Sequence, residues 1–225
     1  MNTIIPTVNQ RRPFNYGFTL VEMSIVLVII GAIFYGLLKS QVLISSSKAK
    51  DVVAKIEDIR TAVTYFQQRY SYLPGDLPNP NNYINANPAL KTGTGGTAGN
   101  GSIEGAVTVA GIAKLGTEIA QAPWQLFNAG LIGTVDSGTP THYLNTSYGP
   151  IQLVKVATAN ALVPGFAAAN PAARNAILFF NLPCDVAIEV DTKMDDGQLT
   201  GGKGMGSAAC ATAGALLPVY AITLN

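Results

Sequence analysis

Residues Phe18–Leu38 read FTLVEMSIVLVIIGAIFYGLL, and this stretch decides the fold because it is apolar over the length of a bilayer. Its 21 residues contain a single charge, Glu22. A helix of this length spans roughly 30 Å, the thickness of one hydrocarbon core. Arg11 and Arg12 precede the run and Lys39 follows it. The pattern predicts a retained membrane helix whose N-terminal side stays in the cytoplasm.

Glu22 is the unusual residue of this run, because a lone carboxylate inside a bilayer is costly and is rarely kept without a partner. No Lys or Arg lies within helical reach of it inside the run. We therefore expect its partner to come from outside this helix, and a freed α-amino group at Phe18 of a neighbouring subunit is one candidate. The alternative is a glutamate near the membrane interface that snorkels or is protonated.

The small residue Gly17 lies before the apolar run, and no small-x-small cleavage site follows the run as in an ordinary signal peptide. The stretch Gly17-Phe18-Thr19-Leu20-Val21-Glu22 strongly resembles the processing site of type IV pilins and type II secretion pseudopilins. The resemblance implies that a prepilin peptidase cuts between Gly17 and Phe18 and methylates Phe18. It also implies that Glu22 sets subunit registry during assembly. It covers about the first quarter of the chain.

The whole chain is predicted to have three parts. Residues 1–17 form a leader that is removed, residues 18–39 a transmembrane and assembly helix, and residues 40–225 a periplasmic or extracellular domain. From Ser40 onward a helical period continues, which predicts one rod of some 50 residues that ends at Tyr72-Leu73-Pro74-Gly75-Asp76. The apolar positions recur at steps of three and four: Ala49, Val52, Val53, Ile56, Ile59, Val63, Phe66 and Tyr70.

Four β-branched or aromatic runs predict an antiparallel sheet of about four strands. They are Ile151–Val156, Ala176–Leu182, Val186–Val190 and Leu216–Leu224. The expected fold class is therefore α+β and pilin-like, with the amphipathic half of the long helix packed on this sheet.

Two further segments have local signals. Residues 120–132 predict a short helix with Pro123 in its first turn and an apolar core face of Trp124, Phe127 and Leu131. Thr92–Gly105, with the sequence TGTGGTAGNGSIEG, predicts a flexible low-complexity loop.

The two cysteines, Cys184 and Cys210, predict a disulfide if the domain is exported, and two free buried thiols are the alternative. The bond would clamp the C-terminal region between the last two strand runs. Closing a loop of this length contributes about 3 kcal/mol to stability.

The acidic segment of Asp191, Asp195 and Asp196 is a weak candidate for calcium, which favours oxygen-rich loops. The EF-hand spacing is not met, because Lys193 stands where a ligand would be. A solvated turn with aspartate capping is the other interpretation. No other cofactor is expected.

His142 is the only histidine, so catalytic and metal arrangements that need several histidines are excluded, and we expect it at the surface.

The formal net charge of +1 gives no field for nucleic acid, and only 12% of the residues are charged. No catalytic constellation stands out, so we expect a structural protein and not an enzyme. The resemblance to type IV pilins implies a pilus subunit that forms a homopolymer or a mixed filament. Its expected partners are the prepilin peptidase and an inner-membrane assembly platform. The single-pass inner-membrane form precedes a surface pilus or periplasmic pseudopilus. A type II secretion pseudopilin and an uncleaved, signal-anchored periplasmic binding domain are the alternatives.

Overall fold

The computed structural model describes residues 17–86, 89–135, 144–210, 212 and 214–224, with side chains left out for residues 37–44. Most of the predicted leader, both arginines before the apolar run, and His142 therefore lie outside the described residues. The chain divides into two compact units, Met1–Leu43 and Ile44–Asn225, and each is described by itself.

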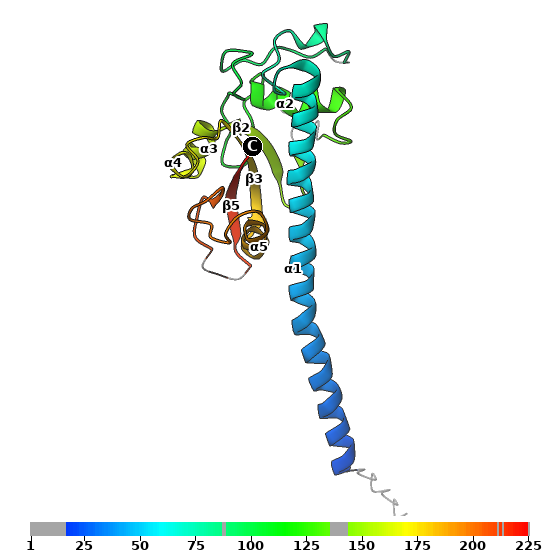
Figure 1. Cartoon of the computed structure of the whole chain (residues 1–225). Helices are drawn as coiled ribbons and strands as arrows, with labels where there is room; N and C mark the ends of the chain where they lie inside the picture. The colour runs from blue at the N-terminus through cyan, green and yellow to red at the C-terminus, as the bar shows by residue number, and fades with distance from the viewer. Residues whose placement is uncertain (1–16, 87–88, 136–143, 211, 213, 225) are drawn as a thin grey trace, which may run out of the picture. The chain divides into compact units, whose positions relative to one another are not determined.

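The predicted long helix is confirmed as α1, Leu20–Tyr70, with 51 residues (Figure 1). It ends where the sequence breaks it: Ser71 has a positive φ of 61°, and Pro74-Gly75 follows. The predicted apolar stripe is also confirmed, since its positions from Ala49 to Tyr70 are buried except for the half-buried Val53. This stretch of α1 joins one hydrophobic core with the strands of the second unit.

The sheet has five antiparallel strands in the order β1-β2-β3-β5-β4. Figure 1 shows the long strands β2, β3 and β5 side by side. Strand β3 pairs with β5 from Ala176 opposite Thr223 to Pro183 opposite Leu216, so the last run of the chain lies in the middle of the sheet. The strand bounds are β1 Leu144–Asn145, β2 Pro150–Lys155, β3 Asn175–Pro183, β4 Gly204–Gly206 and β5 Leu216–Thr223.

The strand prediction for Val186–Val190 is wrong, because these residues lie in helix α5, Cys184–Met194. The other three predicted strands are β2, β3 and β5, while the short edge strands β1 and β4 carry too few residues to show a pattern. In α5 the side chains of Val186 and Val190, one helical turn apart, are both buried. Glu189 forms an ion pair of 3.2 Å with Lys193, again at helical spacing.

Of the short helices, η1 and α2 lie between α1 and β1 in the chain, and α3 and α4 lie between β2 and β3. Helix α2 begins at Glu118, earlier than predicted, so Pro123 lies inside it and not in its first turn. Its predicted core face is only partly right: Trp124 and Leu131 pack half-buried against the core, but Phe127 is exposed. The helix bounds are η1 Pro80–Asn82, α2 Glu118–Asn128, α3 Val156–Leu162 and α4 Phe166–Ala169.

Candidate assembly and cation sites

Gly17 and Phe18 lie immediately before α1, and both are exposed. Thr19 and Glu22 then form a reciprocal capping arrangement around the start of the helix. The Thr19 amide donates to Glu22 Oε2 at 3.2 Å, and the Glu22 amide donates to Thr19 Oγ1 at 3.2 Å. This pairing satisfies two backbone N–H groups that an α-helix start otherwise leaves without partners.

Glu22 therefore has a hydrogen-bonding partner within its own chain, which the sequence analysis did not foresee. The Thr19 hydroxyl also donates to Glu22 Oε2, at 3.1 Å. Threonine three residues before glutamate, at the start of an apolar helical run, is the sequence signal that could have revealed this cap. No ion pair of Glu22 is found among the described residues, so a cationic partner from another molecule stays a prediction.

The helix that follows this cap presents its apolar side chains on every side. All described residues from Leu20 to Gly36 are exposed, including Leu20 at 86% and Phe34 at 62%. A helix that is apolar all round buries its surface in a membrane or among other helices. Within the described residues, no helix combines the length and the mean hydropathy needed to cross a membrane.

The three predicted calcium candidates lie together at the end of α5. Ligand oxygens of Asp191, Asp195 and Asp196 all lie within 4.8 Å of one another. Asp191 is fully buried in the last turn of α5, and Asp195 follows the helix. Helical geometry brings Asp191 and the residue four positions later, Asp195, within about one turn of each other, whereas in a strand they would be roughly 13 Å apart.

The three carboxylates of this cluster differ in the hydrogen bonds that they accept from the protein. Asp191 Oδ1 accepts a hydrogen bond from the Tyr220 hydroxyl at 2.9 Å, while Asp191 Oδ2 is buried with no hydrogen-bond partner in the described structure. Burial raises the pKa of Asp191, against the Tyr220 hydrogen bond that lowers it. Asp195 Oδ2 accepts from the Lys203 and Gly204 amides, and Asp196 Oδ1 from the Gln198 amide. An unpartnered buried carboxylate oxygen next to two further carboxylates suits a hard divalent cation.

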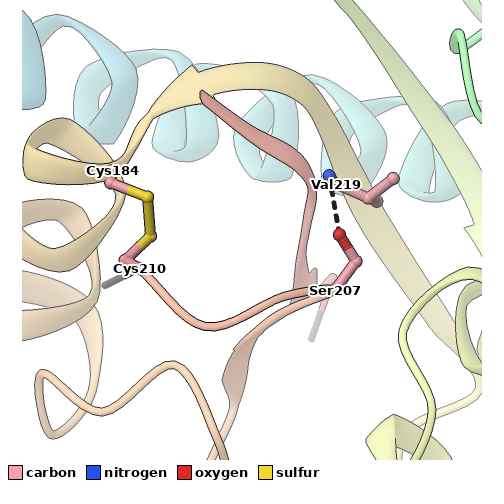
Figure 2. The surroundings of a disulfide bond; sticks show 4 residues. All are labelled: Cys184, Ser207, Cys210 and Val219. Carbon is pink, nitrogen blue, oxygen red and sulfur yellow. Dashed lines mark hydrogen bonds between the residues drawn. A yellow bond between two sulfur atoms is a disulfide. The ribbon is translucent and has the colours of Figure 1, made fainter. Parts of the chain in front are cut away.

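The predicted disulfide is present between Cys184 and Cys210 (Figure 2). Cys184 is the first residue of α5, and Cys210 lies in the segment between β4 and β5. Ser207 fixes the same segment to β5, because its amide donates to Val219 O at 2.9 Å and the Val219 amide donates to Ser207 Oγ at 3.0 Å. The bond thus holds the end of β3 and the start of α5 to the chain that enters β5.

The loop predicted to be flexible is instead held by carboxylates that the sequence analysis did not single out. Asp76 accepts the amides of Gly99, Asn100 and Gly101. Glu118 Oε2 accepts the Glu104 amide at 2.7 Å. Glu104 itself forms an ion pair of 2.7 Å with Lys155. The hydrogen-bonding pattern depends on residues far apart in sequence, so local composition could not reveal it.

Glu118 is the most perturbed carboxyl of this group. It is fully buried, and its Oε1 has no hydrogen-bond partner in the described part of the chain. Burial raises the pKa of Glu118 to about 7, and the nearby charges of Asp76 and Glu104 act in the same direction. Charge–charge repulsion and loss of water thus favour the protonated form of Glu118 in the folded domain.

Comparison with known proteins identifies the N-terminal segment. The family described as "Prokaryotic N-terminal methylation motif" matches residues 12–34, which include Gly17, Phe18 and Glu22. No curated protein and no solved structure matches the chain. The matched motif is the signature of type IV pilins and pseudopilins, and it leads into a long helix packed on an antiparallel sheet. Residues 12–34 of the chain therefore carry the prokaryotic N-terminal methylation motif, the signature that type IV pilins and pseudopilins share.

Proposed function

We propose that this chain is a structural subunit of a type IV pilus and not an enzyme. A prepilin peptidase cleaves between Gly17 and Phe18 and methylates Phe18. The single-pass precursor waits in the bacterial inner membrane, and an assembly platform then moves it into a surface filament. The observation that carries the proposal is the apolar, unburied first stretch of α1 directly after the processing motif.

Two kinds of interaction hold the proposed filament together. Apolar side chains from Leu20 to Gly36 bury one another in a helical bundle, and each Å² of apolar surface removed from water contributes roughly 25 cal/mol. The α-amino group of a neighbour's Phe18 meets Glu22, which contributes registry more than strength. The Thr19 cap holds the Glu22 carboxylate near the start of the helix before this contact forms.

Substitution of Glu22 tests the registry role. Glu22→Val should still be cleaved and methylated but should enter filaments poorly, as measured by its amount in sheared filament fractions relative to membranes. Asp58→Val is the matched control, because Asp58 is an exposed acidic residue on the same helix, outside the motif. Normal incorporation of Glu22→Val would show that the carboxylate does not set registry.

A type II secretion pseudopilin is the alternative within the family, because the same motif serves both systems. The Cys184–Cys210 bond favours a pilus subunit weakly. Deletion of the coding sequence separates the two: loss of surface filaments with a normal set of secreted proteins supports the pilus subunit. Loss of secretion with intact surface filaments supports the pseudopilin.

The acidic cluster adds a proposed calcium site formed by Asp191, Asp195 and Asp196. The buried, unpartnered Asp191 Oδ2 supports it. Isothermal titration of calcium into the detergent-solubilised full chain should give saturable heat at millimolar concentrations, and Asp196→Asn should weaken it while keeping the turn to Gln198. Asp185→Asn, an exposed acidic residue of the same helix, is the control. Absence of calcium heat in the unsubstituted chain would rule out the site.

A further inference from the structure

A small cavity of about 210 Å³ lies between α1, the glycine-rich loop at Gly101 and the start of β3. This is the loop whose amides donate to Asp76. Arg60 comes to it from α1 and Arg174 from the residue before β3. Of the described residues that line it, none is acidic, whereas two carry guanidinium groups. The remaining polar lining comes from Thr64, Gln67 and Asn175. A cavity with this lining favours an anion over a neutral or cationic guest.

The guanidinium of Arg60 is only partly used by the protein. One terminal nitrogen donates to Thr223 O at 2.8 Å, and the other forms an ion pair of 3.0 Å with the exposed Glu57. Its Nε is buried and has no hydrogen-bond partner among the described residues. This N–H is closed to a ligand, so the Arg60 donors that remain for one are the second N–H groups of its two terminal nitrogens.

Arg174 is exposed and has no ion pair in the described structure. One of its terminal nitrogens donates to Asn100 O at 3.5 Å, which is a long contact. The wall between the two arginines is fixed, because the Asn175 side chain donates to Gly101 O and accepts the Ile103 amide. Asp76 also holds this wall, because its oxygens accept the amides of Gly99, Asn100 and Gly101.

We propose that this cavity binds a phosphate group, either as free inorganic phosphate or as part of a phosphorylated molecule. Arg174 supplies a positive charge that has no ion pair in the described structure, and Arg60 supplies a guanidinium whose ion-pair partner, Glu57, is exposed. The planar guanidinium suits phosphate oxygens geometrically. A phosphate group has more acceptor oxygens than a monocarboxylate, so it can accept hydrogen bonds from both guanidinium groups at once. The cavity is smaller than the roughly 300–1,000 Å³ typical of drug-sized ligands, so it takes the phosphate group and leaves the rest of a larger ligand outside.

Phosphorus NMR of inorganic phosphate with the detergent-solubilised full chain tests the proposal independently of filament assembly. We expect saturable binding at millimolar phosphate that weakens about tenfold or more in Arg174→Gln, because one of two charge-assisted contacts is lost. Arg174 is exposed, so this change leaves the fold intact. Arg69→Gln is the matched control, since it removes the same charge from an exposed position of α1 outside the cavity.

Three results would overturn the proposal: no saturable phosphate binding, equal weakening by Arg69→Gln and Arg174→Gln, or acetate binding as tightly as phosphate. A comparison of inorganic phosphate with O-phosphoserine separates the two sources. Tighter binding of inorganic phosphate supports the free ion, and equal or tighter binding of O-phosphoserine supports a phosphorylated molecule.

Discussion

Two stretches of α1 contrast in how they treat their apolar side chains. Between Leu20 and Gly36 every described side chain is exposed, although the stretch is almost wholly apolar. Between Ala49 and Tyr70 one face of the same helix is buried in the core of the second unit, and the other face is polar. The apolar face of the second stretch is covered by the rest of the chain. The apolar surface of the first stretch needs a membrane or other copies of the chain to cover it.

A matched pair of phenylalanines on α1 should show this contrast most strongly. Phe66 is fully buried and Phe34 is 62% exposed. Phe66→Ala should lower the free energy of unfolding by about 3–5 kcal/mol, because it leaves a cavity, and Phe34→Ala should change it by less than about 0.5 kcal/mol. Urea unfolding of the detergent-solubilised chain, followed by Trp124 fluorescence, measures both. Equal losses in the two variants would contradict the contrast.

Removal of the disulfide should have the next largest effect, and only on the second unit. The double variant Cys184→Ser, Cys210→Ser should lose about 3 kcal/mol of unfolding free energy, because the unfolded chain gains freedom. The same urea titration measures it, and a reducing agent should change the unsubstituted chain but not the variant. Unchanged stability in both comparisons would show that the segment between β4 and β5 does not need the bond.

Glu118 should make the stability of the second unit depend on pH. Burial raises the pKa of Glu118 from 4.5 to about 7, so the folded state favours its protonated form. The resulting stabilisation is fully present below pH 4.5 and is lost as pH rises through 7, with an upper limit of roughly 3 kcal/mol. Unfolding free energies measured from pH 5 to 8 should therefore fall more in the unsubstituted chain than in Glu118→Gln.

The exposed Glu57 supplies a control for this pH series. Glu57→Gln should keep the decline in stability with rising pH, because its carboxyl is not the buried one. If Glu118→Gln shows the same decline as the unsubstituted chain, the pH dependence has another origin.

The smallest effect should come from the cap at the start of α1. Thr19→Val removes the hydroxyl that accepts the Glu22 amide and should destabilise the first turn by about 1 kcal/mol. Hydrogen exchange of the first-turn amides should quicken, while exchange in the buried stretch from Ala49 to Tyr70 stays the same. Unchanged exchange in the first turn would mean that the cap contributes nothing to the helix start.

The parts of the fold that were predictable from the sequence follow strong periodic patterns. The long helix and strands β2, β3 and β5 each carry such a pattern over several residues. The run Val186–Val190 was mistaken for a strand because a short apolar run fits either structure, and the Glu189–Lys193 spacing is the better signal.

Side-chain contacts between distant segments were not predictable. The glycine-rich loop has the composition of a flexible linker, yet Asp76 and Glu118 bind its amides from other parts of the chain. The residues proposed for processing and assembly lie in one short local motif, which sequence alone reveals. The arginine-lined cavity depends on Arg60 and Arg174, more than a hundred residues apart, and only the fold brings them together.

The mass of the N-terminal peptide, taken from a cell-membrane fraction, tests the central claim most directly. A peptide that begins with N-methylated Phe18 is the predicted result, because we propose cleavage after Gly17, within the motif matched at residues 12–34. A peptide that still begins at Met1 or Asn2 would contradict the account. The exposed apolar stretch of α1 would then belong to an uncleaved anchor, and Glu22 would lose its proposed partner.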